Sequence, residues 1–114
     1  MTTTTAGEMI ACIRTALGLT RADLAAAIDV SHESIRSWEV GRRPVPAGIW
    51  DELAKLEAQA DQEVAGHLAA LERGAPAVFQ FDTGPQAGPV GWQQVIAARV
   101  HRQRPDLTIS RGNW

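Results

Sequence analysis

The sequence predicts a mainly helical fold, with four helices followed by a small α/β addition. Alanine dominates the apolar residues, which make up 45% of the 114-residue chain, and alanine has the highest helix propensity of any residue. Apolar side chains recur at steps of three and four over long stretches, which is the period of an amphipathic helix. Two short segments, residues 77–81 and 107–109, instead have the composition of strands. A chain of this length forms one domain, or a small domain with an appendage.

The first half divides into three short helices with recognisable ends. Gly18 stops the first helix. Thr20 caps the second, with Asp23 in the capping-box position three residues later. Ser31 caps the third, and Gly41 ends it. The side chains expected on the buried faces are Met9, Ile10, Ile13 and Leu17, then Leu24, Ala25 and Ile28, then Ile35 and Trp38.

The second half begins with a longer helix, expected over residues 47–73. It carries an apolar stripe at helical spacing, made of Ile49, Leu53, Leu56, Ala60, Val64, Leu68 and Leu71. Gly74 ends it. A strand over residues 77–81, a helix over 91–103 and a second strand at 107–109 follow.

The formal net charge of −2 hides segregated charges. Residues 51–73 hold six acidic side chains. Residues 31–46 and the tail from residue 99 are basic, and these are the places where a polyanion could dock. The tail arginines could flank DNA, but we expect them to pair with the acidic long helix across a dimer or to face water: Arg99, Arg102, Arg104 and Arg111.

Residues 20–44 carry the most informative pattern. They contain two short helices joined by a turn of about three residues, with a small polar residue capping the second, which is the arrangement of a helix-turn-helix. The helix capped by Thr20 packs across the helix capped by Ser31 through Leu24, Ile28 and Ile35. The N-terminal end of the Ser31-capped helix therefore projects, and such an end can enter the major groove of DNA.

Over about residues 8–56 the chain resembles the Cro/C1-type helix-turn-helix proteins. The resemblance rests on Leu17-Gly18-Leu19-Thr20, Leu24-Ala25, Ile28, Val30-Ser31, Ser34-Ile35, Trp38-Glu39 and Gly41-Arg42-Arg43-Pro44. It implies a lambda-repressor-like DNA-binding domain over residues 7–56. Residues 1–6 before it are polar, and we expect them to be disordered. The family often has glycine in the turn where this chain has Asp29, a residue type that tolerates left-handed backbone.

The resemblance also implies roles by position. Residues at the start of the third helix would face bases or the groove wall: Ser31, His32, Glu33, Ser34 and Ser37. His32 could donate to guanine, and Glu33 could accept from the N4 of cytosine. The phosphate contacts would come from Arg21, Arg36, Arg42 and Arg43, although Arg36 could equally contact a base. Arg14 and Glu39 would form a structural pair.

The second half is similar to the YdiL-like group, which includes anti-CRISPR-associated repressors of phages and mobile elements. The similarity rests on the order of the elements and on Val90-Gly91-Trp92 followed by Ala97. It implies a dimerisation region over residues 57–114 and repression of the protein's own operon. The residues expected at the dimer interface are Leu68, Leu71, Val78, Phe79, Phe81, Trp92 and Ile96.

Other classes of function have little support. The single Cys12 cannot form an intrachain disulfide, and we expect a buried, inert thiol. His67 and His101 have no partner at metal-ligand spacing, so we expect no metal and no cofactor. The sequence has no nucleophile–base pair and no phosphate-binding loop, so an enzyme is not expected. We also expect no signal peptide and no membrane span.

The sequence therefore predicts a cytoplasmic, homodimeric repressor that binds an inverted-repeat operator in double-stranded DNA. Some repressors of this kind also bind RNA, which the residues do not test. An antitoxin that binds a toxin through its C-terminal half and represses its operon is the main alternative. A protein-interaction module without DNA binding is the other, since Glu33 would place a carboxylate near phosphate.

Overall fold

The computed structural model describes residues 6–85 and 87–111. Its elements are, in order, α1 (Ala6–Ala16), α2 (Arg21–Ala27), α3 (His32–Glu39), α4 (Ala47–Glu72), β1 (Val78–Gln80), α5 (Val90–Gln103) and β2 (Thr108–Ser110). The predicted order of helices and strands is confirmed, with bounds that shift by a residue or two. Residue 6, expected in a disordered start, already belongs to α1, whereas residues 1–5 lie outside the described residues.

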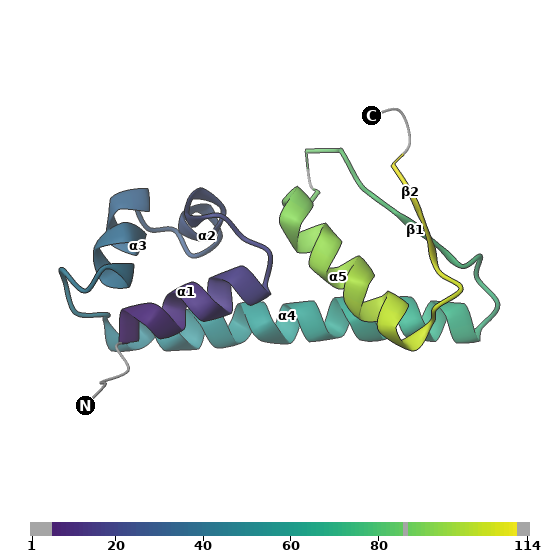
Figure 1. Cartoon of the computed structure of the whole chain (residues 1–114), viewed down its shortest axis with the longest axis horizontal. Coiled ribbons are helices and arrows are strands. Elements are labelled where there is room, and N and C mark those ends of the chain that lie inside the picture. The colour runs from purple at the N-terminus through teal and green to yellow at the C-terminus, as the bar shows by residue number, and fades with distance from the viewer. Residues whose placement is uncertain (1–5, 86, 112–114) are drawn as a thin grey trace.

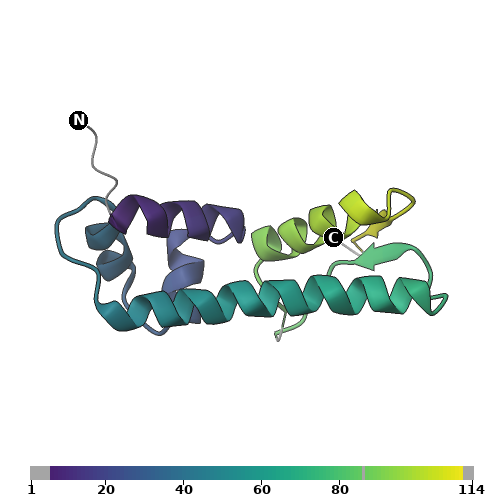
Figure 2. The ribbon, with the colours of Figure 1, turned by 90° about the horizontal axis from the view of Figure 1, so that it is seen from below.

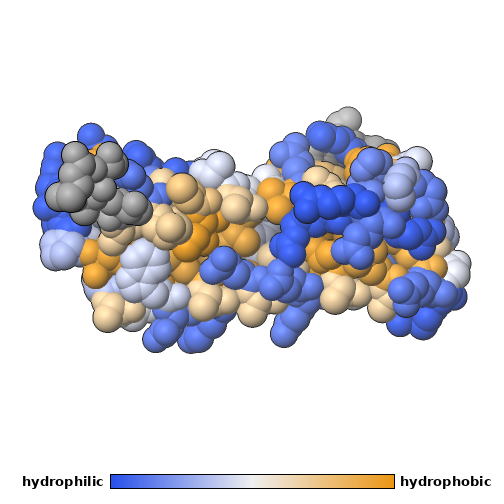
Figure 3. All heavy atoms as spheres, turned by 60° about the horizontal axis from the view of Figure 1, so that its bottom comes forward, coloured by the Kyte–Doolittle hydropathy of each residue, from blue (hydrophilic) through white to orange (hydrophobic). Residues whose placement is uncertain are grey.

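The long helix α4 forms the base on which the other elements sit (Figure 1). Helices α1, α2 and α3 cover its first half, and α5 with the two strands covers its second half (Figure 2). The molecule is elongated, measuring 49 × 32 × 22 Å along its principal axes. No helix in the described residues is both long and apolar enough to cross a membrane. From the α4 side, hydrophobic patches alternate with hydrophilic side chains (Figure 3).

The ends of the first three helices follow from their capping residues. The Thr20 hydroxyl accepts from the Asp23 amide at 3.0 Å, and the Asp23 carboxylate accepts from the Thr20 amide at 2.9 Å. This is a complete capping box. Gly18 and Gly41 adopt left-handed backbone at φ 72° and 79°. Asp29 is also left-handed, at φ 56°, so it takes the backbone conformation that glycine often provides in this turn.

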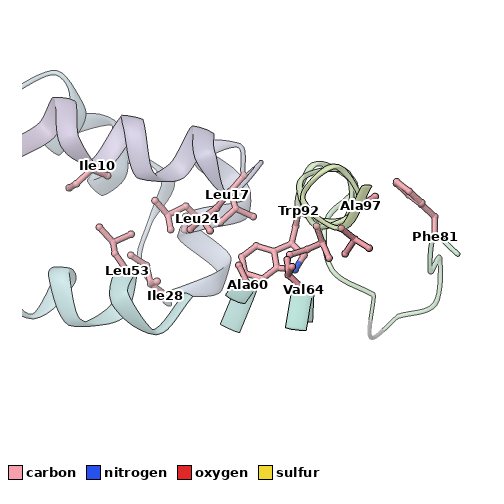
Figure 4. Close-up of a cluster of buried hydrophobic side chains, with 14 of the residues drawn as sticks. Ile10, Leu17, Leu24, Ile28, Leu53, Ala60, Val64, Phe81, Trp92 and Ala97 are labelled. Carbon is pink, nitrogen blue, oxygen red and sulfur yellow. The ribbon is translucent and has the colours of Figure 1, made fainter. Parts of the chain in front are cut away.

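One hydrophobic cluster runs through both halves of the molecule (Figure 4). Its fully buried side chains include Ile10, Leu24 and Leu53 under the first three helices, and Ile96 and Val100 on α5. The helical spacing predicts most of these correctly, because one face of each helix is covered. The full set of fully buried large side chains is Ile10, Leu24, Ile35, Leu53, Ile96 and Val100.

Two expectations for α1 are wrong. The helical spacing assigns Met9 to the buried stripe, but Met9 is 45% exposed. The thiol of Cys12, expected to be buried, is also exposed. On this short helix Ile10 is fully buried and Ile13 is partly buried, and the residues beside this narrow stripe turn toward solvent.

The C-terminal region is a strand–helix–strand unit. Strands β1 and β2 pair in parallel, with Val78 opposite Thr108 and Phe79 opposite Ile109, and α5 makes the crossover between them. The Gln93 side chain fixes the long loop before α5. Its carbonyl accepts from the Asp82 amide, and its amide group donates to the carbonyls of Asp82 and Gly88.

The predicted dimer-interface residues require a correction. Five of the seven are buried within the chain's own core, since α5 and the strands fold back onto α4: Leu71, Phe79, Phe81, Trp92 and Ile96. Leu68 is partly buried in the same cluster. Val78 is 46% exposed, and is the one member of that set that faces solvent.

The two halves of the molecule are in backbone contact at two glycines, Gly18 and Gly91. A Cβ on Gly91, at the start of α5, would lie 2.0 Å from the Gly18 carbonyl oxygen. A Cβ on Gly18 would lie 2.1 Å from the Gly91 carbonyl oxygen. The backbones of the α1–α2 turn and of α5 therefore touch directly, and they can do so only because both residues lack a side chain.

Candidate nucleic-acid interface

The N-terminal end of α3 projects from the first half of the molecule, away from α4 (Figure 1). Ser31 caps it, because its hydroxyl oxygen accepts from the Ser34 amide at 3.0 Å. The Ser31 hydroxyl also donates to the Ser34 hydroxyl at 2.9 Å. Both serine side chains are thus used to order the end of the helix, which leaves His32 and Glu33 at its exposed first turn.

His32 and Glu33 differ in how they are held. Both are exposed, but the Glu33 carboxylate lies 3.5 Å from an Arg42 guanidinium nitrogen and 3.6 Å from one of Arg36. Within the described part of the chain, the His32 imidazole makes no hydrogen bond or ion pair. Its two ring nitrogens are thus available to a ligand, one as a donor and the other as an acceptor in the neutral ring.

Ser37 does not belong with the base-reading candidates, which corrects the sequence-based expectation. Its side chain is 2% exposed, and its hydroxyl donates to Glu33 at 3.3 Å. Its carbonyl accepts from the amides of Arg42 and Arg43. Ser37 lies one helical turn after Glu33, on the side of α3 that faces the protein. It therefore links the Glu33 side chain to the Arg42–Arg43 backbone.

The Arg42–Arg43 loop is fastened to α3. Gly41 reverses the chain, and the amides of Arg42 and Arg43 then donate to the Ser37 carbonyl at 2.8 and 3.3 Å. The Arg43 guanidinium reaches back to donate to the Ser34 hydroxyl at 3.1 Å. The two cationic side chains therefore flank the exposed face of α3, where phosphates would pass if its end entered a groove.

A charge network ties α3 to α1 and α2. The Glu39 carboxylate accepts from Arg14 at 2.7 and 3.1 Å and from Arg21 at 2.9 Å, and its side chain is only 3% exposed. Burial alone would raise the pKa of Glu39. The hydrogen bonds and charges of Arg14 and Arg21 outweigh burial and hold that pKa below its ordinary value of 4.5.

The structure thus places the Arg14–Glu39 pair where the sequence expects it, and adds Arg21 as a second partner. The expected contact of Arg21 with phosphate stays a prediction, because its side chain is still 35% exposed and a guanidinium has five donors. Arg36 is exposed and lies beside Glu33.

Three of the four C-terminal arginines have partners within the chain. Arg99 on α5 donates to Asp61 on α4 at 2.6 Å. Arg104 makes a bidentate pair of hydrogen bonds to the Asp106 carboxylate, at 2.8 and 3.0 Å. This contact raises the pKa of Arg104 and lowers that of Asp106. Arg111 lies over the Phe81 ring at 5.3 Å. The pairing of Arg99 with the acidic long helix is therefore intramolecular.

Residues 12–56 match the model of the helix-turn-helix family. The match covers α2, the turn, α3 and the Arg42–Arg43 loop, and it extends into α1 and α4. It supports a DNA-binding transcription regulator of the Cro/C1 type, a class that is not enzymatic. A search of curated proteins found no match.

Proposed function

We propose that this chain is a transcriptional repressor that binds double-stranded DNA as a homodimer at an inverted-repeat operator, in the cytoplasm. We further propose that it represses its own operon, carried by a phage or mobile element, as anti-CRISPR-associated repressors do. The observation that carries the proposal is the capped, exposed end of α3, with Arg42 and Arg43 beside it.

The proposed contacts fall into two classes. His32 reads a base edge by donating to guanine, and Glu33 accepts from cytosine N4. Arg42 and Arg43 bind phosphate and set the register of the helix in the groove. Because Arg42 lies near Glu33 in the free protein, docking would exchange this exposed ion pair for two contacts to DNA. An exposed ion pair is worth only about 0–1 kcal/mol, so the exchange costs little.

Ser31 and Ser34 have a supporting part in this proposal. Their hydroxyls are engaged in capping and with Arg43, so they line the groove wall and hold the reading helix in place.

Dimerisation supplies the specificity that one α3 lacks. One short helix reads only a few base pairs, and a two-fold pair doubles the sequence read and sets two half-sites about 34 Å apart. Because α5 and β1 bury most of their apolar side chains internally, the proposed interface shifts to the exposed apolar residues of the strands. These are Val78, 46% exposed, and Ile109, 50% exposed.

The test is selection of bound duplexes from a random DNA library with the purified protein, followed by sequencing. We expect a palindromic motif whose half-sites are one helical turn apart. Enrichment of no sequence by the folded protein would overturn the proposal and favour a protein partner such as a toxin. Enrichment of a single unrepeated half-site would overturn the homodimer.

A further inference from the structure

Strand β2 has an open outer edge. In the described residues the sheet consists of β1 and β2 alone. The Thr108 amide donates to the Ala77 carbonyl, and the Ser110 carbonyl accepts from the Phe81 amide, both at 2.9 Å. Successive residues of a strand direct their backbone groups to opposite edges. The N–H and C=O of Ile109, which stands between these two residues, therefore point away from β1.

This outward donor and acceptor match those of a second copy of the same strand. When two strands pair in antiparallel fashion, two residues directly opposite each other can exchange both N–H···O=C bonds. A two-fold axis beside Ile109 would therefore satisfy both groups of each copy with those of the other. It would also turn a sheet of two strands, which is marginal by itself, into a wider one.

The composition of β2 favours pairing at this edge. Residues 107–110 contain no charge and no proline, which are the features that commonly protect an exposed strand edge. On the outer edge of β1 the corresponding backbone groups belong to Gln80, whose side chain is polar. At the edge of β2 they belong to Ile109, whose side chain is apolar and 50% exposed. Pairing at β2 would thus remove apolar surface from water, which pairing at β1 would not.

The Ile109 side chain borders an apolar groove of about 330 Å³ between β2 and α5. The floor of the groove is buried and includes Phe81, Ala97 and Leu107, and Phe81 points toward Ala97 on α5 (Figure 4). The exposed apolar residues of its rim are Ala98 and Ile109. Opposite residues of paired strands have Cβ atoms about 5 Å apart on one face of the sheet. Ile109 of a second copy would therefore pack beside Ile109, at the open side of this groove.

We infer that β2 pairs in antiparallel fashion with β2 of a second copy, about a two-fold axis at Ile109. The homodimer then contains one four-stranded sheet in the order β1-β2-β2-β1, with the α5 helices of both copies on the same face. This inference rests on the homodimer of the proposed function and on none of its DNA contacts.

The inferred pairing narrows the dimer interface to one of the two exposed strand residues. Val78 is exposed and Phe79 is buried, so their side chains lie on opposite faces of the sheet, and Phe79 is the residue opposite Ile109. Val78 therefore lies on the other face from Ile109 and on the strand farther from the axis. The two residues are similarly exposed, at 46% and 50%, which makes Val78 a matched control.

The first test measures the oligomeric state of the full chain without DNA, by sedimentation equilibrium. We expect a dimer for the wild type. Ile109→Lys should raise the dissociation constant of the dimer at least about a hundredfold, because the axis sets the two lysines opposite each other and two apolar contacts are lost. Val78→Lys makes the same change in charge and should leave the dissociation constant unchanged.

The second test locates the axis by cross-linking. Cys12→Ser first removes the exposed native thiol. In that background Ile109→Cys should form an intermolecular disulfide under mild oxidation, since opposite Cα atoms of a hydrogen-bonded antiparallel pair are about 5.5 Å apart, a distance that a disulfide spans. Val78→Cys should not cross-link at the same protein concentration. Non-reducing electrophoresis reads out both variants.

Two results would overturn the inference and leave the homodimer standing. These are a wild-type dimer whose dissociation constant is unchanged in Ile109→Lys, and cross-linking of Ile109→Cys no faster than that of Val78→Cys. A wild type that is monomeric at about 100 µM would overturn both the inference and the homodimer. Circular dichroism checks that Ile109→Lys is folded, and if it is not, the cross-linking decides. DNA binding is tested separately by the selection of duplexes, because neither measurement includes DNA.

Discussion

The two regions that lie on α4 are held together by different chemistry. The helix-turn-helix is held by two helix caps, Thr20 and Ser31, and by the buried Glu39 carboxylate, which pairs with two arginines. The C-terminal region, in its described residues, is held by hydrogen bonds rather than by a buried ion pair: Gln93 fixes a loop, and the Trp92 indole donates to the Glu63 carboxylate on α4. Its ion pairs, Arg99–Asp61 and Arg104–Asp106, lie at the surface.

This difference explains why one region presents an exposed, polar helix end and the other does not. The Ser31 cap and the buried Glu39 pairs with Arg14 and Arg21 fix α3 in place. Its first turn can therefore remain polar and exposed. The strand–helix–strand unit has only two short strands, and a sheet this small needs cover from a helix to be stable. It therefore buries Phe79 and Phe81 against its own helices, whereas Val78 and Ile109 stay exposed.

The largest effects should come from cavities under each region. Leu53→Ala and Ile96→Ala each remove a side chain that is 1% exposed, and each should cost about 2–5 kcal/mol of unfolding free energy. Leu53 lies under the helix-turn-helix and Ile96 under the strands. Because α4 and the Gly18–Gly91 contact join the regions, both variants should unfold in one transition in urea.

The measurement is urea denaturation followed by circular dichroism and by tryptophan fluorescence. Coincident curves for both variants would support one cooperative unit. Two separated transitions in Ile96→Ala would instead show that the C-terminal region unfolds by itself.

Most of the first region could be predicted from the sequence, because its signals are local. Thr20, Ser31 and Gly41 act within a few residues of where they stand, and Asp29 adopts the left-handed turn that its position requires. The error at Ser37 has a physical cause. Its polar type suggests exposure, but its place on α3 turns it inward, and only the Glu33 contact shows how a buried hydroxyl is satisfied.

The second region could be predicted as elements but not as an assembly. The apolar stripes show which faces need cover, but they do not show whether α5 or a second chain provides it. Nothing in the sequence pairs Val78 with Thr108 in parallel, or places Glu63 next to Trp92. These contacts join residues 30 and 29 positions apart, and depend on how far the chain folds back along α4.

A smaller effect is expected from the buried charge. Glu39→Gln leaves Arg14 and Arg21 without their anion, and it should cost about 1–3 kcal/mol. The folded-state pKa of Glu39 is lowered from 4.5, so its contribution is present above that value and is lost as the pH falls below it. The variant should therefore lose less stability than the wild type between about pH 5 and about pH 3, as measured by urea denaturation at each pH.

The matched control for Glu39→Gln is Asp61→Asn in the other region. The Asp61 side chain is 69% exposed, and its pair with Arg99 should contribute no more than about 1 kcal/mol. The buried ion pairs of Glu39 and the exposed pair of Asp61 should differ in how much they stabilise the chain. Equal losses of unfolding free energy in the two variants would contradict this difference.

The contact between the regions can be tested with two glycine-to-alanine changes that should have opposite signs. Both lie in helices, where alanine is favoured over glycine by about 1 kcal/mol. A Cβ added to Gly66 on α4 would have nothing within 4 Å, whereas one added to Gly91 would meet backbone at 2.0 Å. Gly66→Ala should stabilise the chain, and Gly91→Ala should destabilise it by about 1–3 kcal/mol. Thermal unfolding measures both, and a stabilising Gly91→Ala would show that the regions can separate without loss.

The smallest effect separates the two basic segments by their part in DNA binding. Replacing both Arg42 and Arg43 by alanine should weaken binding to every duplex, and reduce the slope of log affinity against log salt by about one per lost phosphate contact. Arg102→Ala removes an exposed arginine of α5 and should leave the slope unchanged. Both variants are titrated with the selected operator and a scrambled duplex, with fluorescence anisotropy as the readout. A reduced slope for Arg102→Ala would mean that DNA also runs along α5, and that the two regions share one interface.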